Sequence, residues 1–432
     1  MARAGELPTN WPFHLVFGLH APSLVAASVR TPKLNASLVG IVADVDPTRF
    51  TAPQFGEARR EPGNKWAFWY FKPAPVPRDL PLTAPTIKAL SAADSALGRL
   101  QGVGTLIKDP ELLIGPYLMQ EAVASSRIEG TQTSVSEVLQ SEASGLPTSS
   151  EDVAEVERYL AATRQGYELV RRLPITQRLI LQLHWTLLSG VRGQEKLPGE
   201  FRRTPVWVGS PTDSPETAAF VPPLPGDLPD AIGDWEDFVN MPDESPTLIR
   251  CGLMHYQFET IHPFLDGNGR IGRLLINLML MEEGRLTTPL LYMSGYLESH
   301  RAEYYDRLQR VRENGEMQEW LQFFLTAVQK SAEDAVMRSE KLVTLRERYL
   351  AEAATTRSNL SALVGLLFAN PFLTVARVEK AVGLTGQGSR NLIKDAARRG
   401  WLDEIGTSGR GGRVYWVARD LLDVIDAPTS YD

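Results

Sequence analysis

The sequence contains a single cysteine, Cys251, among its 432 residues. One thiol cannot form a disulfide within the chain, so the sequence predicts a reducing, cytoplasmic location. There is no run of 18 uncharged apolar residues, and we expect no membrane-spanning helix. Residues 11–29 lack the uninterrupted apolar stretch of a signal peptide. The net charge of −7 argues against a chain that coats nucleic acid along its whole length, but it allows a local basic surface.

What the chain does contain is hydrophobic residues, 43% of the total, arranged mostly at helical spacing. This pattern predicts a mainly α fold of two or three domains. Pro116 suits the first position of a helix ending near Gly130, and Ser134-Val-Ser-Glu137 has the capping-box pattern of a further helix start. Other helices are expected at residues 86–106, 152–171, 176–190 and 333–357, and a short strand at 38–45.

The C-terminal region differs from the rest of the chain in charge. Residues 359–420 contain nine Lys or Arg against five Asp or Glu. Three expected helices, 359–368, 375–382 and 389–399, precede two strands around residues 408–412, which is the order of a winged helix-turn-helix. Basic side chains recur on the third helix and follow on the wing, at Arg390, Lys394, Arg398, Arg410 and Arg413. DNA binding and a protein-interaction or dimerisation role both fit this pattern.

A short segment from His262 to Arg273 concentrates the residues that bind phosphate. Residues 248–261 have apolar side chains at helical spacing, and Pro263 ends that helix. Asp266-Gly-Asn-Gly269 is a turn cluster, after which a second apolar helix begins. Glycines at a helix start let backbone N–H groups approach an anion closely. Arg270 and Arg273 share one helix face and can bind phosphate oxygens.

Two further side chains of this segment bring metal and proton chemistry. The Asp266 carboxylate is a suitable ligand for one Mg²⁺ ion that also binds phosphates. His262 titrates near neutral pH and is suited to accept a proton from a hydroxyl nucleophile. Each residue taken singly also fits an ordinary turn between two helices. Their combination within twelve residues favours a catalytic loop.

These twelve residues resemble the Fic family signature, HPFx[D/E]GNGRxxR, at every fixed position. The resemblance covers roughly residues 66–330 and implies a helical catalytic domain that moves AMP from ATP to a Thr, Ser or Tyr hydroxyl of a target protein, the chain itself included. Glycines at both loop positions favour AMP transfer over the phosphate transfer of one family branch. By position, the resemblance implies a general base at His262, a Mg²⁺ ligand at Asp266, a phosphate-binding backbone at Gly267, Asn268 and Gly269, and phosphate-binding guanidinium groups at Arg270 and Arg273.

The resemblance also implies an inhibitory helix at about residues 116–130. Ser125-Ser-Arg-Ile-Glu129-Gly130 matches the family's [S/T]xxxE[G/N] motif. In this interpretation Glu129 pairs with Arg273 and takes the place of the γ-phosphate. Ser125 and Glu129, four residues apart, are expected on one helix face. The alternative is a helix end with an incidental glutamate.

Weaker assignments complete the interpretation. Gln257, Tyr304 and Tyr305 resemble positions beside the nucleotide, although core packing also explains Tyr305. Residues 201–209, with 220–223 as the returning strand, resemble the family's β-hairpin flap, which pairs with the target's backbone. Arg312 stands where some relatives have an adenine-contacting Asn.

The expected organisation has four parts. Residues 1–65 have no clear role, 66–330 form the catalytic region, 331–358 connect, and 359–432 form the winged helix. Two alternatives stay open: removal of AMP from modified protein through a water activated by Glu129, and a DNA-binding regulator that senses nucleotide. The sequence leaves a homodimer open and does not identify the target.

Overall fold

The structure is a computed structural model that describes residues 46–61, 63, 66–106, 111–148, 150–210, 212–241, 245–356, 358–408 and 413–427. The strand expected at 38–45 lies outside these residues, as does most of the N-terminal segment. Among the described residues the fold is mainly α, as the sequence predicts. None of the described helices is long and apolar enough to cross a membrane.

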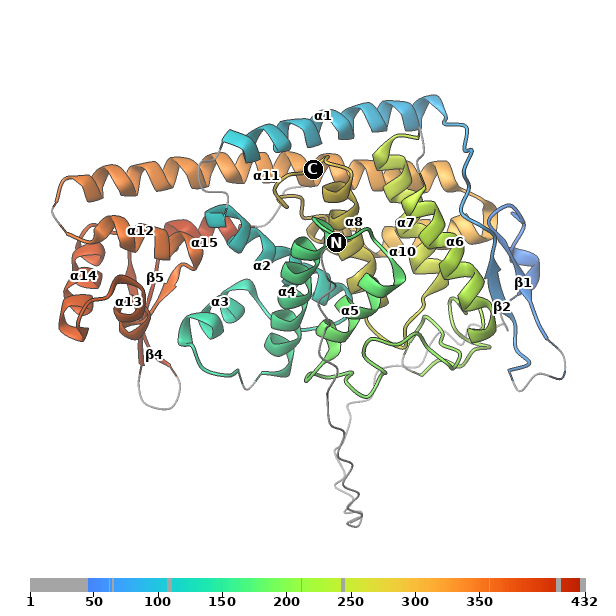
Figure 1. Cartoon of the computed structure of the whole chain (residues 1–432), viewed down its shortest axis with the longest axis horizontal. Helices are drawn as coiled ribbons and strands as arrows, with labels where there is room; N and C mark the ends of the chain where they lie inside the picture. Colours follow the sequence, from blue (N-terminus) through green and yellow to red (C-terminus); the bar gives the residue numbers. More distant parts are fainter. Residues whose placement is uncertain are drawn as a thin grey trace, which may run out of the picture. The chain divides into compact units, whose positions relative to one another are not determined.

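The first part of the chain is mainly helical (Figure 1). In chain order its helices are α1 (Ala84–Leu106), α2 (Glu111–Ile128), α3 (Val135–Ser144), α4 (Glu151–Val170), α5 (Gln177–Leu188), α6 (Leu228–Asn240), α7 (Thr247–Ile261), α8 (Asn268–Glu282), α9 (Ser294–Ser299), α10 (Arg301–Asn314) and α11 (Met317–Ala354), with single 3-10 turns at Pro47–Arg49 and Pro225–Asp227. One long connection lies between α5 and α6. Two short strands, β1 (Gly56–Arg59) and β2 (Tyr70–Pro73), pair antiparallel.

The α7 and α8 helices lie at the centre of the core. Every residue of α7 from Leu248 to Ile261 is buried, and so is every residue of α8 from Asn268 to Leu280. A helix that is buried all round needs neighbours on each side, and here they include α2, α4, α5, α6 and α11. The loop between α7 and α8 is therefore fixed at both ends by fully packed helices.

The α2 helix begins earlier than expected. The sequence placed Pro116 at its first position, but α2 starts at Glu111, so Pro116 lies inside the helix. Proline inside a helix lacks one backbone donor, which this helix tolerates one and a half turns after its start. The capping box at the start of α3 is confirmed: Ser134 Oγ accepts the Glu137 N–H, and the Glu137 carboxylate accepts the Ser134 N–H.

The helix expected at residues 333–357 is present as the second half of a longer helix, because α11 runs without interruption from Met317 to Ala354 and packs along α1 (Figure 1). The hairpin expected at 201–209 and 220–223 is not formed as a strand pair. Among the described residues this arm contains one antiparallel bridge, between Val208 and Phe220.

The C-terminal module contains α12 (Leu360–Ala369), β3 (Phe372–Leu373), α13 (Val375–Val382), α14 (Gly386–Arg398), β4 (Asp403–Ser408), β5 (Arg413–Val417) and α15 (Arg419–Asp426). Its three strands form an antiparallel sheet in the order β3-β5-β4. The three helices and the last two strands were expected. The two-residue β3 and the final α15 were not, because such short segments leave little periodicity to read.

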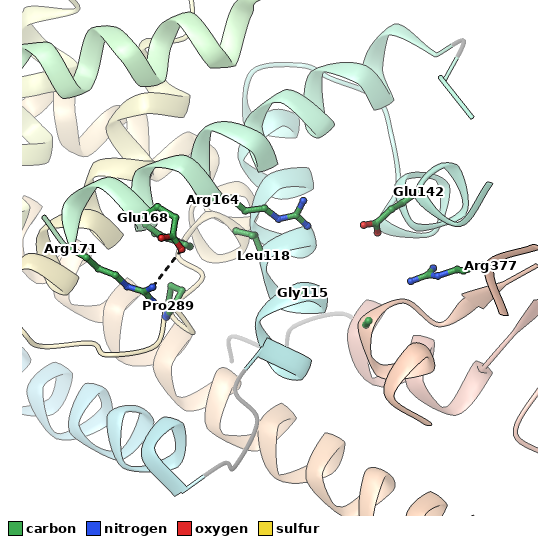
Figure 2. Close-up of a pocket in the computed structure, with 10 residues that line it drawn as sticks. Gly115, Leu118, Glu142, Arg164, Glu168, Arg171, Pro289 and Arg377 are labelled. Carbon is green, nitrogen blue, oxygen red and sulfur yellow. Dashed lines mark ion pairs between the residues drawn. The ribbon is translucent and has the colours of Figure 1, made fainter. Parts of the chain in front are cut away.

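The module contacts the first helices of the central region. Asn370, fully buried after α12, donates from Nδ2 to the Leu139 carbonyl (2.9 Å) and to the Glu142 carboxylate (3.0 Å) of α3. Its Oδ1 accepts the Phe372 N–H (2.9 Å). A cavity opens beside this contact (Figure 2).

Candidate functional site

The loop that follows α7 begins with a strained residue. His262 has φ 50° and ψ 59°, in the left-handed region that non-glycine residues rarely occupy. Asn268 closes the loop, because its Oδ1 accepts the Phe264 N–H (2.8 Å) and its Nδ2 donates to the Phe264 carbonyl (2.9 Å). The Asn268 side chain thus has a structural role here, and only its backbone is available to an anion.

Arg202 holds the same strained turn from outside. Its side chain donates from Nε to the His262 carbonyl (2.8 Å) and from Nη2 to the Pro223 carbonyl (2.5 Å). Its backbone N–H donates to the Pro263 carbonyl (2.9 Å). The side chain is 2% exposed, and burial lowers the pKa of Arg202 to about 10. The first residues of the expected flap therefore support the loop.

His184 of α5 holds the other side of the loop. Its Nδ1 accepts the Gly199 N–H (2.9 Å), which leaves Nε2 to donate to the Asp266 carbonyl (3.0 Å). The ring also stacks on Phe264, with centroids 3.7 Å apart. Burial lowers the pKa of His184 to about 4, so the ring is neutral. The sequence alone does not single out His184 for this role.

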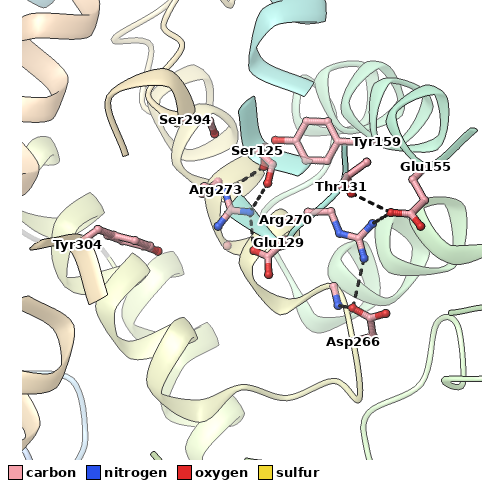
Figure 3. Close-up of polar contacts among 12 residues, drawn as sticks. Ser125, Glu129, Thr131, Glu155, Tyr159, Asp266, Arg270, Arg273, Ser294 and Tyr304 are labelled. Carbon is pink, nitrogen blue, oxygen red and sulfur yellow. Dashed lines mark hydrogen bonds and ion pairs between the residues drawn. The ribbon is translucent and has the colours of Figure 1, made fainter. Parts of the chain in front are cut away.

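The start of α8 is occupied by the carboxylate of Glu129, from the turn that follows α2 (Figure 3). Arg273 is 1% exposed at its side chain and donates from Nη2 to Glu129 Oε1 at 2.7 Å. It also donates from Nε to Ser125 Oγ (2.9 Å) and from Nη2 to the Ser125 carbonyl (2.8 Å). A Cβ added at Gly269 would collide with Glu129 Oε1, so the carboxylate lies directly against the backbone of the helix start.

Glu129 and Arg273 each stabilise the charged form of the other. Burial acts to raise the pKa of Glu129, but the charge and hydrogen bond of Arg273 outweigh it, and the pKa is lowered. Burial acts to lower the pKa of Arg273, and the Glu129 charge outweighs it in the same way. Both groups are therefore ionised at neutral pH. Glu129 lies in the turn just after α2 and keeps 34% of its side-chain surface exposed.

Arg270 has hydrogen-bond donors to spare. It is 3% exposed, and its Nη2 donates to Asp266 Oδ1 (3.2 Å). Its Nη1 lies 3.8 Å from the buried Glu155 carboxylate, which also accepts from Thr131 (3.0 Å). Among the described residues, neither Nε nor Nη1 of Arg270 has a hydrogen-bond partner. Buried donors without partners are expensive unless a ligand satisfies them.

His262 is partly buried and kept neutral. Burial, followed by the charge of Arg202, lowers its pKa to about 4, and the Glu129 carboxylate acts in the opposite direction. A neutral imidazole can accept a proton. Asp266, 41% exposed at its side chain, accepts the Gly267 N–H (2.6 Å) with Oδ1. The described residues contain no group of three or more His, Cys, Asp or Glu arranged to hold a metal ion.

Glu259 of α7 is a buried acid that sequence reasoning did not single out. It is 8% exposed, and its Oε1 has no hydrogen-bond partner among the described residues. Burial raises the pKa of Glu259 to about 7; Arg273 acts against this rise and Glu129 adds to it. No local sequence signal marks this residue, because an isolated Glu on an apolar helix looks like a surface position.

The four residues assigned more weakly to the site differ in how exposed their side chains are. Gln257 is 3% exposed and donates to the Ala74 carbonyl (2.9 Å), and Tyr304 is buried with its hydroxyl 2.8 Å from His255 Nε2. Tyr305 is 38% exposed, and the charges of Glu129 and Arg273 reach its hydroxyl. Arg312 is buried and lies 3.8 Å above the Phe220 ring. Only Tyr305 of these four presents an accessible side chain.

Comparisons with known proteins match two segments of the chain to one family. Residues 87–168 match the Fic/DOC family N-terminal domain, and residues 174–280 match the Fic/DOC family domain. Protein adenylyltransferase Fic of Drosophila willistoni is 36% identical over 165 residues, which cover 38% of this chain and 30% of the fly protein. The protein of the same name from Culex quinquefasciatus is 34% identical over 161 residues, covering 36% of this chain and 28% of the mosquito protein.

A solved structure shows the same fold. The Fic family protein from Desulfovibrio desulfuricans G20 superposes with a TM-score of 0.52 and 20% sequence identity, covering 79% of this chain and 97% of that chain. By contrast, the matched segments span less than a third of the length of the curated relatives.

Proposed function

Because residues 87–168 and 174–280 of this chain belong to the Fic/DOC family, we propose that the protein transfers AMP from ATP to a hydroxyl side chain of a protein. The observation that supports this most is the pair of buried guanidinium groups, Arg270 and Arg273, at the glycine-bounded start of α8. Such an arrangement binds a chain of phosphates. The names of the adenylyltransferase relatives favour the same chemistry.

In the proposed reaction His262 accepts the proton of the target hydroxyl, whose oxygen attacks the α-phosphorus of ATP. The bond from that phosphorus to the bridging oxygen breaks, and pyrophosphate leaves. Backbone N–H groups at Asn268 and Gly269 hold the phosphate oxygens, since the Gly267 N–H already donates to Asp266 Oδ1. Arg270 and Arg273 balance the charge that develops. Asp266 is the carboxylate available for Mg²⁺, which would neutralise phosphate charge when bound.

Glu129 restrains this reaction in the proposal. Its carboxylate pairs with Arg273 at 2.7 Å and lies against Gly269, where the terminal phosphate would bind. ATP must displace the carboxylate or bind with its α-phosphate out of line. Glu129→Gly removes the obstacle and leaves Arg273 free to bind the phosphate.

The test is transfer of a label from the α-phosphate of ATP to protein, followed by mass spectrometry for added AMP. We expect Glu129→Gly to raise labelling at least about tenfold, because ATP no longer has to break the charge-assisted contact between Glu129 and Arg273. His262→Ala in the Glu129→Gly background should abolish labelling. Equal labelling of the wild type and Glu129→Gly would remove the inhibitory role, and labelling that survives His262→Ala would remove the proposed base. Release of AMP from modified protein by the wild type alone would favour hydrolysis by a water that Glu129 activates.

A second candidate function concerns the C-terminal module. The element order resembles a winged helix, and Arg390, Lys394 and Arg398 are all exposed along α14. A basic row on such a helix suits a phosphate-lined groove. Binding to duplex DNA that weakens as salt is raised, and that is lost in Arg390→Ala/Lys394→Ala, would support a DNA-binding role. Retention by the double variant would remove it.

A further inference from the structure

The cavity beside Asn370 has a volume of about 390 Å³ and lies apart from the 262–273 loop, between the C-terminal module and α2, α3 and α4 (Figure 2). Its volume lies in the range of sites that bind small molecules. The charged and small residues at its wall are Gly115 in α2, Glu142 in α3, Arg164 and Glu168 in α4, Arg171 at the end of α4, and Arg377 in α13. No residue of 262–273 lines it, and neither does Glu129.

The cations of this cavity outnumber the acids that balance them. Arg171 pairs with Glu168 at 3.5 Å, and the Glu142 carboxylate accepts from Asn370. Among the described residues, no carboxylate lies within 4.0 Å of Arg164 or Arg377. Figure 2 shows the Arg164 side chain extending from α4 into the space between α2 and α3.

Arg377 carries its charge in a partly dehydrated position. Its Nη1 donates to the Phe372 carbonyl (3.2 Å). Burial lowers the pKa of Arg377, with Glu142 acting in the opposite direction. A guanidinium group has five N–H donors, so most donors of both Arg164 and Arg377 remain available to an anion.

The rest of the wall supplies apolar surface and a buried hydroxyl. Leu118 and Pro289 line the cavity together with Tyr167, which is 6% exposed. The Tyr167 hydroxyl has no hydrogen-bond partner among the described residues. That hydroxyl is enclosed by protein, and burial raises the pKa of Tyr167. The Tyr167 ring therefore adds apolar surface to the wall.

We propose that this cavity binds a small organic oxyanion, a carboxylate or a phosphomonoester. Arg164 and Arg377 hold the anionic group, and the apolar part of the ligand packs on Leu118 and Pro289. A ligand in this position contacts α2 and the C-terminal module at the same time. The proposal does not depend on AMP transfer.

The experiment uses the full chain without nucleotide and two probes, citrate and inorganic phosphate, at ionic strength matched with sodium chloride. Calorimetry measures binding, and hydrogen–deuterium exchange locates it. We expect protection of residues 115–118, 164–171 and 369–377. Arg164→Ala/Arg377→Ala should weaken binding at least about tenfold, since each lost charged hydrogen bond is worth about 1.5–3 kcal/mol. Arg172→Ala removes the same charge from an exposed residue outside the cavity wall and should bind like the wild type.

Each outcome decides the proposal. Protection with citrate alone identifies a carboxylate ligand, and protection with phosphate alone identifies a phosphomonoester. Absence of binding to both probes, protection confined to 262–273, or equal binding by the double variant would overturn the proposal. If circular dichroism shows that the double variant is unfolded, Arg164→Glu replaces it, because Arg164 is exposed and its removal breaks no ion pair among the described residues.

Discussion

A side chain at Gly269 would require the ends of Glu129 and Arg273 to move, because Glu129 Oε1 and Arg273 Nη1 occupy the space that a Cβ would take. The same space lies at the start of α8, where backbone N–H groups meet an anion. The glycine therefore leaves room for the Glu129 carboxylate at the helix start. In the proposed function a phosphate of ATP would compete with Glu129 for this place.

We predict that Gly269→Ala, made in the Glu129→Gly background, lowers AMP transfer at least about tenfold, because the methyl group obstructs a phosphate contact worth more than about 1.4 kcal/mol. Transfer of the α-label measures the effect. Gly233→Ala is the matched control, since Gly233 lies in α6 with no neighbouring atom within 4 Å of its added Cβ. Undiminished labelling by Gly269→Ala would show that phosphate does not approach this backbone.

Glu259 makes stability depend on pH. Its folded pKa of about 7 lies above the ordinary value of 4.5, so the folded state holds the proton more tightly than the unfolded state. The resulting stability is present at pH values below 4.5 and is lost as pH rises toward 7.

Accordingly, Glu259→Gln should gain stability relative to the wild type as pH rises from 5 to 8, by up to about 3 kcal/mol. Urea unfolding at a series of pH values measures the difference. Glu129 contributes to the raised pKa, so the gain should be smaller in the Glu129→Gly background. A constant difference between the two proteins across this pH range would contradict the shifted pKa.

At the scale of elements, α3 illustrates a helix whose start is set locally. In its capping box the Ser134 side chain accepts the Glu137 backbone N–H, and the Glu137 side chain accepts the Ser134 backbone N–H. Gly145 ends the helix with φ 66°. Asn370 of the C-terminal module donates a hydrogen bond to the Leu139 carbonyl of this helix. The position of α3 therefore depends on its own cap and on a distant residue.

Ser134→Ala should lower the free energy of unfolding by about 1 kcal/mol, because an N-cap side chain no longer accepts the Glu137 N–H. Urea unfolding monitored by circular dichroism measures this change. Ser136→Ala, within the same helix, provides the control and should have little effect or be slightly stabilising. Equal effects of both substitutions would mean that the cap contributes nothing.

At the scale of the whole molecule, α11 joins the catalytic region to the C-terminal module. Arg338 of α11 is 3% exposed and donates to the carbonyls of Val424 (2.7 Å) and Ala427 (2.8 Å) at the end of α15. Asn370 joins the module to α3 in the same way. Because buried hydrogen bonds join the two parts, we expect them to unfold together.

Asn370→Ala tests this connection. It leaves the Leu139 carbonyl and the Phe372 N–H without their partner, at a cost of about 2–3 kcal/mol. We expect one urea transition, shifted to lower concentration, by both far-UV circular dichroism and tryptophan fluorescence. Asn391→Ala, an exposed change on α14, should leave the transition in place. Two separate transitions in the wild type would show that the parts unfold independently.

Much of this organisation follows from local patterns. The helix order, the α3 capping box and the three helices of the C-terminal module were predicted from spacing and cap residues. The start of α2 and the strand pairing of the 201–209 arm were predicted wrongly. In both, the local preference of Pro116 or of the β-branched residues in the arm did not decide the outcome.

The sequence by itself determined the chemistry: a histidine, an acid, two glycines and two arginines within twelve residues, together with a glutamate motif 133 residues before His262. These patterns can be read from the sequence because they consist of residues close together in the chain. The tertiary structure alone decided that Glu129 meets Arg273, that Arg202 and His184 hold the loop, and that Glu259 is buried beside it. Those contacts join residues far apart in the chain, and only the packing of the core brings them together.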